Sequence, residues 1–208
     1  MAAQVTALKF QKRNHDRVSV YLDGRFAFGL PAIVAARLKV GQTLSAAEIA
    51  ALQKEGEVEK NYERALNFLS YRPRSRAEIV TYFRRRGVSE AQIEAVIERL
   101  ERAGFVDDTA FARFWVENRE RFRPKGLRAL RYELRRKGLA DKVIEEALVG
   151  IQAEDSAYRA AGKRARQLSG KDKAIFERKL VDYLARRGFD YEVARDVAAR
   201  YWDELAGD

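Results

Sequence analysis

Apolar and polar residues alternate along the first part of the chain. The alternation runs through residues 18–22 and again through residues 26–28, with Asp23-Gly24 between the two runs. A period of two is typical of half-buried strands, and Asp-Gly between such runs predicts a tight hairpin, because both turn positions favour a positive φ. Residues 5–10 can supply a third strand. We therefore expect a small sheet in this part of the chain.

Short helices are expected after the strands. Pro31 suits the first turn of a helix over residues 32–38. Ser45, with Glu48 three residues later, forms the capping box that opens a second helix. His15 falls in a polar stretch that we expect to be a loop. Residues 1–60 are thus predicted to form a small α/β cap with a β-hairpin.

Farther along, the apolar residues have a helical period and a short motif occurs three times. The segment Arg84–Val88 (RRRGV) recurs at Arg135–Leu139 (RRKGL) and at Ala185–Phe189 (ARRGF). The glycines of these segments are 51 and 50 residues apart. If positions are counted from the glycine, the basic triplet occupies −3 to −1, and apolar residues recur at −8, −4, +1 and +9. An internal period of this length predicts a helical repeat protein.

Each motif indicates the end of one helix and the start of the next. Positions −8 and −4 share a helix face, the basic residues complement the carbonyl end of the helix dipole, and the glycine supplies a left-handed cap. Capping residues for the following helices are Ser89, Asp141 and Asp190. A further helix is predicted before each motif, over residues 62–70, 109–118 and 156–166.

The predicted fold is therefore mainly α-helical, with three tandem three-helix repeats after the α/β cap. Such repeats would stack as an elongated array, each burying its apolar face on itself and on its neighbours. The expected domains are the cap at 1–60 and the repeats at 61–107, 108–152 and 153–208.

The composition excludes several classes of protein. The chain has no cysteine and a single histidine, so disulfides, iron–sulfur clusters, thiolate zinc sites and cysteine nucleophiles are ruled out. No apolar run approaches the ~18–20 residues that a membrane span needs, and the N-terminus does not resemble a secretory signal. We expect a soluble, cytoplasmic protein that binds no membrane.

The balance of charge points to an anionic partner. The formal net charge is +10, and residues 61–150 carry 20 basic against 14 acidic side chains. Arginines outnumber lysines by 29 to 12. Because the forked guanidinium group suits phosphates and carboxylates, we expect the partner to be a polyanion or an acidic groove of a protein.

Motifs for catalysis are missing. Neither Gly162-Lys163 nor Gly170-Lys171 has the earlier glycine of a phosphate-binding loop. Asp107-Asp108 is the only adjacent aspartate pair, and Asp108 is better placed to cap a helix that starts at Thr109 than to hold a metal ion. We expect no enzyme activity, no metal and no cofactor.

Basic residues concentrate in two tracts and in the three triplets. The triplets also have a structural explanation, since basic residues stabilise a helix C-terminus and keep a surface soluble. The tract from Arg119 to Arg131 surrounds Pro124 and Gly126, between helices, where the period of one helix face does not explain it. The candidate anion-binding residues are Arg72, Arg74, Arg76, Arg84, Arg85, Arg86, Arg119, Arg121, Arg123, Lys125, Arg128, Arg131, Arg135, Arg136, Lys137, Arg186 and Arg187.

Aromatic residues mostly fall on apolar stripes. Core packing rather than stacking on bases is expected for Phe83, Phe105, Phe111, Trp115 and Tyr183. If any aromatic side chain stacks on a base, Tyr71, beside Arg72, is our choice.

One combination of segments is more specific than any of its parts. It comprises Gly104–Ala112 (GFVDDTAFA), Asn118-Arg119, Lys125-Gly126 and Glu133–Leu139 (ELRRKGL), preceded by Ser75–Glu78 (SRAE) leading into Arg84–Gly87. Together these resemble the RecX family of bacterial regulators of the RecA recombinase. The resemblance covers residues 62 to about 205, and the third repeat departs most, because Ala185 replaces the first basic residue of the triplet.

The resemblance implies three tandem three-helix repeats and a regulator, usually an inhibitor, of RecA. It implies that the protein lies in the groove of the RecA–DNA filament, binds single- and double-stranded DNA, and hinders strand exchange, ATP hydrolysis and coprotease function in DNA repair and the SOS response. The candidate residues above would then contact the acidic filament surface or the DNA backbone, with Arg186 and Arg187 contributing less. A monomer is expected.

Two other hypotheses remain from the residues alone. A helix-turn-helix-like DNA-binding regulator would also have three-helix units with basic helices. Acidic residues on the helices after each glycine count against it, because phosphates would repel Glu90, Glu94, Glu98, Glu145, Glu146 and Asp196. A helical-repeat enzyme would need a clustered acid/base constellation that the sequence does not contain.

Overall fold

The computed structural model describes residues 2–12 and 14–206, which divide into two compact units. The first unit comprises Met1–Arg74 with Ile79–Val106, and the second comprises Ser75–Glu78 with Asp107–Asp208. Each unit contains two hydrophobic cores. Within the described residues no helix is both long enough and apolar enough to cross a membrane.

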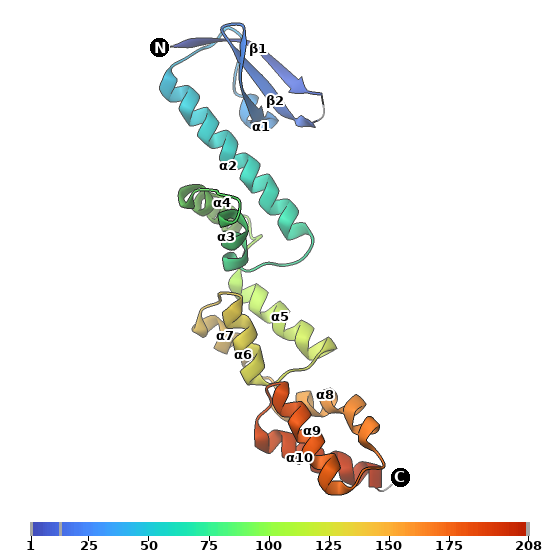
Figure 1. Cartoon of the computed structure of the whole chain (residues 1–208). Coiled ribbons are helices and arrows are strands. Elements are labelled where there is room, and N and C mark those ends of the chain that lie inside the picture. Colours follow the sequence, from blue (N-terminus) through green and yellow to red (C-terminus); the bar gives the residue numbers. More distant parts are fainter. Residues whose placement is uncertain (1, 13, 207–208) are drawn as a thin grey trace. The chain divides into compact units, whose positions relative to one another are not determined.

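The first unit begins with an antiparallel sheet, as the alternation predicts. The hairpin turns at Asp23 and Gly24, whose φ angles are 49° and 80°, so the predicted tight turn is confirmed. His15 lies in a strand rather than in a loop, because pairing between the first two strands continues as far as Gln11 and Asn14. The strands lie in the order β3-β2-β1-β4 (Figure 1) and are β1 (Ala3–Gln11), β2 (Asn14–Leu22), β3 (Arg25–Pro31) and β4 (Thr43–Leu44).

One long helix occupies the residues for which two helices were predicted, one from Ser45 and one over residues 62–70. After the short α1 (Ala32–Ala35), α2 runs unbroken over Ala46–Ser70. The Ser45 hydroxyl accepts the Glu48 N–H and the Glu48 carboxylate accepts the Ser45 N–H, so the capping box is confirmed. The first turns of α2 pack in the core beneath the sheet and its last turns pack in the next core. The predicted domain limit at residue 60 therefore falls inside a helix.

Three three-helix units follow, as predicted. The first consists of the last turns of α2 with two further helices, and the second and third have three helices each (Figure 1). These helices are α3 (Arg76–Arg84), α4 (Glu90–Arg102), α5 (Asp108–Phe122), α6 (Leu127–Arg136), α7 (Asp141–Leu148), α8 (Ala153–Leu168), α9 (Lys173–Arg186) and α10 (Tyr191–Ala206).

The predicted register of the repeat is confirmed. The glycines at position 0 have φ angles of 71°, 80° and 85°, as left-handed helix caps require. The side chains at −8 and −4 are fully buried in every repeat, and they are Ile79, Phe83, Leu130, Leu134, Leu180 and Leu184.

Several helix caps differ from the prediction by one residue. Asp107, not Asp108, caps α5, because its extended backbone places the carboxylate 2.7 and 3.1 Å from the N–H groups of Thr109 and Ala110. Asp108 instead accepts the N–H of Arg76 at 2.8 Å, and burial raises the pKa of this carboxyl. Asp141 is the first residue of its helix rather than the cap.

Phe105 is the aromatic residue for which the core prediction is wrong. Its side chain is 55% exposed, because it follows the left-handed turn at Gly104 and so lies outside the apolar stripe of α4. Phe83 and Phe111 are buried as predicted.

In the second unit, the backbone carbonyl at position −1 twice accepts a hydrogen bond from the residue just before an earlier helix. The Ser75 hydroxyl donates to the carbonyl of Lys137 at 2.7 Å, and the Gly126 N–H donates to the carbonyl of Arg187 at 3.1 Å. Next to these bonds, Gly138 lies against Ala77 and Gly188 lies against Ala129, with no room for a β-carbon on either glycine. The turn after a basic triplet is therefore also a packing surface for the start of an earlier helix.

We expect Gly188→Ala to destabilise the protein more than Gly87→Ala. Both substitutions place an L side chain at a left-handed φ, which costs about 1–2 kcal/mol. A β-carbon at Gly188 would also lie 2.6 Å from the backbone nitrogen of Ala129, whereas one at Gly87 would have nothing within 4 Å. Overlap with backbone should add about 1–3 kcal/mol. Urea unfolding of the two variants measures the difference, and equal losses would contradict this packing role.

Candidate functional site

Position −3 of the triplet is held by an ion pair in the first two repeats. Arg84 makes two bonds to Glu90, at 2.8 and 2.9 Å, and Arg135 makes one to Asp141 at 2.8 Å. Both acids stand at position +3, across the glycine turn. In the third repeat both partners are replaced, by Ala185 and Tyr191. A basic residue at position −3 therefore links the two sides of the glycine turn through an ion pair with position +3.

Position −1 is occupied by internal contacts in all three repeats. Arg86 stacks on the ring of Tyr82 at 3.6 Å and donates to the carbonyl of the same residue. Lys137 binds Glu78 at 2.7 Å. Arg187 donates to the carbonyl of Pro124 at 3.0 Å. These cations fix the repeats in place rather than reach for an external ligand.

Position −2 is the member of the triplet that stays accessible. It is an exposed arginine in every repeat, namely Arg85, Arg136 and Arg186. In the part of the chain that the structure describes, none of the three meets a carboxylate, and only Arg136 lies near a ring, 5.7 Å from that of Tyr132. One unpaired guanidinium group per repeat is thus available to an anion.

The tract from Arg119 to Arg131 is mostly helical, which corrects its predicted place between helices. Arg119 and Arg121 belong to α5, and Arg128 and Arg131 belong to α6, so only residues 123–126 connect the two. The tract continues through both helix ends because α5 extends past residue 118, where the prediction ended it.

Three of the six cations of this tract are paired inside the protein, two of them with Glu133. Its carboxylate accepts from Arg119 at 2.8 Å, from the indole N–H of Trp115 at 2.9 Å and from Lys125. Burial alone would raise the pKa of Glu133, but the bonds from Lys125, Arg119 and Trp115 outweigh burial and hold this pKa below the usual 4.5. Arg131 is also paired, with Glu145 at 2.8 Å.

A small pocket lies beside this carboxylate. It has a volume of about 240 Å³ and is lined by Trp115, Arg119, Glu133, Arg136 and Lys137. Arg119 and Lys137 both lie 4.7 Å from the centre of the Trp115 ring. Because two cations lie over the indole ring of Trp115, we do not assign this ring to stacking on a base.

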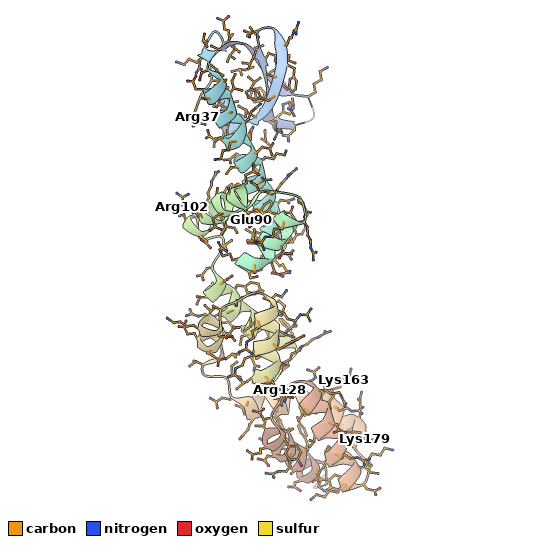
Figure 2. The ribbon with its side chains drawn as sticks, turned by 60° about the vertical axis from the view of Figure 1, so that its left-hand side comes forward. Arg37, Glu90, Arg102, Arg128, Lys163 and Lys179 are labelled. Carbon is orange, nitrogen blue, oxygen red and sulfur yellow. The ribbon has the colours of Figure 1, made fainter. Side chains whose placement is uncertain are left out.

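Some other exposed cations of the second unit have no ionic partner within the described residues. Others are paired, namely Arg159, Lys173, Arg195 and Arg200. The unpaired ones include Arg123 and Arg128 of the predicted tract. Lys163 on α8 and Lys179 on α9 are also exposed and unpaired, although they are not among the candidate residues given above (Figure 2). The accessible positive charge of the second unit therefore includes position −2 and these four unpaired residues.

Arg72, Arg74 and Arg76 surround the connection from α2 to α3. Arg72 donates to the carbonyl of Pro73 at 2.8 Å, and the guanidinium group of Arg74 lies 3.9 Å from the centre of the Phe68 ring. Arg76 is placed by its backbone bond to Asp108. Aromatic and carbonyl groups thus hold the first two side chains in defined positions.

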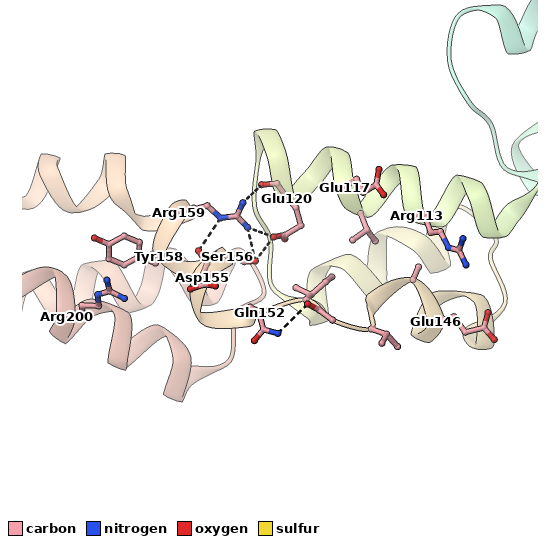
Figure 3. Close-up of a pocket in the computed structure, with 15 residues that line it drawn as sticks. Arg113, Glu117, Glu120, Glu146, Gln152, Asp155, Ser156, Tyr158, Arg159 and Arg200 are labelled. Carbon is pink, nitrogen blue, oxygen red and sulfur yellow. Dashed lines mark hydrogen bonds and ion pairs between the residues drawn. The ribbon is translucent and has the colours of Figure 1, made fainter.

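A groove in the second unit has the opposite electrostatic character. It has a volume of about 830 Å³ and lies among α5, the connection from α7 to α8, and α10 (Figure 3). Arg159 and Arg200, which line it, are paired with Glu120 and Glu204. The carboxylates of Glu117, Glu146 and Asp155 line it without an ionic partner among the described residues. Arg113 also lines the groove without an ionic partner among the described residues, so unpaired acidic groups outnumber unpaired basic ones here by three to one and disfavour a phosphate.

Within residues 2–12 and 14–206, no three His, Cys, Asp or Glu side chains come together as metal ligands. The Asp107 carboxylate caps α5, and the Asp108 carboxylate accepts the N–H of Arg76.

Comparison with known proteins identifies the family. Models of the RecX N-terminal domain and of the first, second and third three-helix domains of RecX match residues 3–45, 62–100, 107–148 and 152–198. The chain belongs to the RecX family.

Curated relatives agree with this assignment. "Regulatory protein RecX" of Bacillus subtilis (strain 168) is 35% identical over 195 residues, which cover 91% of this chain and 74% of the relative. The protein of the same name from Prosthecochloris aestuarii is 39% identical over 143 residues, or 69% of this chain and 94% of the relative. Membership of RecX therefore supports a regulatory role.

Solved RecX structures have the same fold. A crystal structure of regulatory protein RecX matches with a TM-score of 0.76 and 28% identity, over 94% of this chain and 98% of the other. The structure of RecX from Lactobacillus salivarius matches with a TM-score of 0.61 and 26% identity, over 73% of this chain and 97% of the other.

The carboxylates that pair with the basic residues of this RecX chain were not predicted from the sequence. Glu133 stands at position −5, where the other two repeats have Tyr82 and Tyr183. This difference marks the position as unusual, but the spacing of four residues would have paired Glu133 with Lys137, whereas its partners are Arg119 and Lys125.

We expect Glu133→Gln to lower the free energy of unfolding at neutral pH. We also expect it to make that free energy change less as the pH falls. The folded pKa of Glu133 is depressed, so its contribution is present above about pH 4.5 and is lost as the pH falls through the folded value. The side chain is only 17% exposed, and loss of its charge leaves two cations without their partner, which should cost about 1–2 kcal/mol.

Thermal unfolding at about pH 7 and about pH 3 measures this effect, and the two proteins should differ less at the lower pH. Glu145→Gln is the matched control, because it removes the same charge from an exposed pair. A constant difference between Glu133→Gln and the parent at both pH values would contradict the ionic role of Glu133.

Proposed function

We propose that this protein is a non-catalytic regulator that binds the RecA–DNA filament and inhibits recombinase activity. RecX membership supports the regulatory role. The observation that carries the proposal is the recurrence of an exposed, unpaired arginine at position −2 of all three repeats. A repeat protein that offers one such cation in each repeat suits a partner that is itself a repeating polyanion.

The inhibition would be steric and electrostatic. Guanidinium groups at position −2 would bind phosphates of the filament DNA or carboxylates of the filament surface, and the bound protein would occupy space that strand exchange requires. Binding that favours one state of the filament over another shifts its equilibrium without any chemical step. The activities of RecA in DNA repair and the SOS response would all decrease, namely strand exchange, ATP hydrolysis and coprotease function.

The roles within the triplets follow from their contacts. We assign binding to Arg85, Arg136 and Arg186, with Arg123 and Arg128 as further contacts. Positions −3 and −1 act mainly in folding, since their charges are used internally. These assignments reduce the number of candidate binding residues. They also give Arg186 a larger part in binding than the resemblance to the family implied.

We expect Arg85→Gln/Arg136→Gln/Arg186→Gln to weaken inhibition of RecA roughly tenfold, because three phosphate or carboxylate contacts are removed. The measurement is ATP hydrolysis by RecA on single-stranded DNA, with the protein titrated in at two salt concentrations. Direct binding to single-stranded DNA should also show a salt dependence shallower by about 2 in its logarithmic slope.

The control is Arg84→Gln/Arg135→Gln/Arg200→Gln, which removes the same charge from arginines that are paired in the folded protein. It should change inhibition less than about twofold. Equal losses in the two triple variants would overturn the assignment of position −2.

The alternative is a DNA-binding regulator that acts without RecA. It predicts inhibition only when the protein is abundant enough to coat the DNA, and loss of that inhibition with salt. Inhibition well below one molecule per DNA-bound RecA excludes it and supports a filament regulator.

A further inference from the structure

Tyr71 stands apart from the other tyrosines of the first unit. It is the C-terminal cap of α2, its side chain is 78% exposed, and its backbone remains helical, with φ −80° and ψ −34°. No hydrogen bond or ring contact of its side chain occurs within the described residues. By contrast, cations lie over the rings of Tyr21, Tyr62 and Tyr82 in the same unit.

The turn of α2 before Tyr71 carries an ordered stack of charged and aromatic groups. Phe68 and Tyr82 stack with their ring centres 4.2 Å apart and an angle of 18° between their planes. Arg74 lies over Phe68 at 3.9 Å and Arg86 lies over Tyr82 at 3.6 Å. The order Arg74–Phe68–Tyr82–Arg86 thus fixes α2, the connection to α3 and the end of α3 against one another.

Helix geometry places Tyr71 beside this stack, three residues after Phe68 on the surface of α2. Residues three apart in a helix are neighbours on its surface, and the helical backbone of Tyr71 continues that relation from Phe68. Proline at position 73 restricts the connection that follows, so the ring projects from a stiff support. A bare aromatic ring beside stacked guanidinium groups combines the two elements of a platform for single-stranded nucleic acid.

We propose that Tyr71 stacks on an unpaired base of single-stranded DNA, while Arg85, the residue after α3, binds the adjoining backbone. Arg85 is exposed and has no ionic partner in the described chain. Because the base faces in a duplex are covered by their neighbours, this contact is made with single strands and not with double-stranded DNA. The inference rests on the proposed function and adds a preference for the single strand.

Tyr71→Ala tests the stacking. We expect about tenfold weaker binding of a fluorescent oligothymidylate and no more than about twofold weaker binding of a duplex of equal length, both at one salt concentration. Tyr71→Phe should bind like the parent, because the ring and not the hydroxyl makes the contact. Tyr191→Ala is the matched control, since it removes a ring that is 67% exposed on α10 and should change neither affinity.

The outcomes separate this inference from the proposed function. Unchanged oligothymidylate binding by Tyr71→Ala, or equal losses for single strand and duplex, would overturn the stacking role. If the parent protein failed to inhibit ATP hydrolysis by RecA, the proposed function would fail whatever Tyr71 does. Thermal unfolding of Tyr71→Ala should match the parent, because so exposed a ring contributes little to the core.

Discussion

The glycine turn that follows each basic triplet is the constraint on which the second unit depends. At Gly188 the turn must adopt a left-handed φ, present a flat surface to Ala129 and leave the carbonyl of residue 187 facing the N–H of Gly126. A side chain at Gly188 would interfere with the first two requirements. Gly138 meets the same requirements against Ala77. Gly87 has open space where a β-carbon would lie, so there the left-handed cap alone demands glycine.

This constraint also decides which charges are available. A residue next to the glycine lies against the start of an earlier helix, so Lys137 and Arg187 find partners there, in Glu78 and in the carbonyl of Pro124. A residue three before the glycine faces position +3 across the turn, where Glu90 and Asp141 stand. Only the residue between them projects from the helix end without a partner in the described chain. The net charge of +10 thus overstates the accessible charge at the triplets and leaves its position unspecified.

The sequence was sufficient for most of the elements and for the register of the repeat, and insufficient for the site. Gly87, Gly138 and Gly188 could be aligned because a left-handed cap and the buried positions −8 and −4 recur at a fixed spacing. The unbroken α2 could not be predicted with the same method, because one helix there serves two cores and its apolar face changes partner on the way. The sequence shows how many basic residues there are, but not which of them form ion pairs. Glu133, for example, is far in sequence from Arg119 and near to it only after folding.

The middle repeat has Glu133 at position −5, where the flanking repeats have tyrosine. This single difference changes which basic residues of the repeat are paired inside the fold. In the flanking repeats, Tyr82 and Tyr183 lie under the arginine at position −1 and leave every formal charge in place. In the middle repeat Glu133 gathers Arg119 and Lys125 into the fold, and Lys137 turns to Glu78 and to Trp115. Two cations of the basic tract are thereby paired with a single carboxylate within the fold. Which charges stay accessible in a repeat is therefore set by which cations find an internal partner, and not by the density of basic residues in the sequence, so that position −2 is available to an anion in all three repeats.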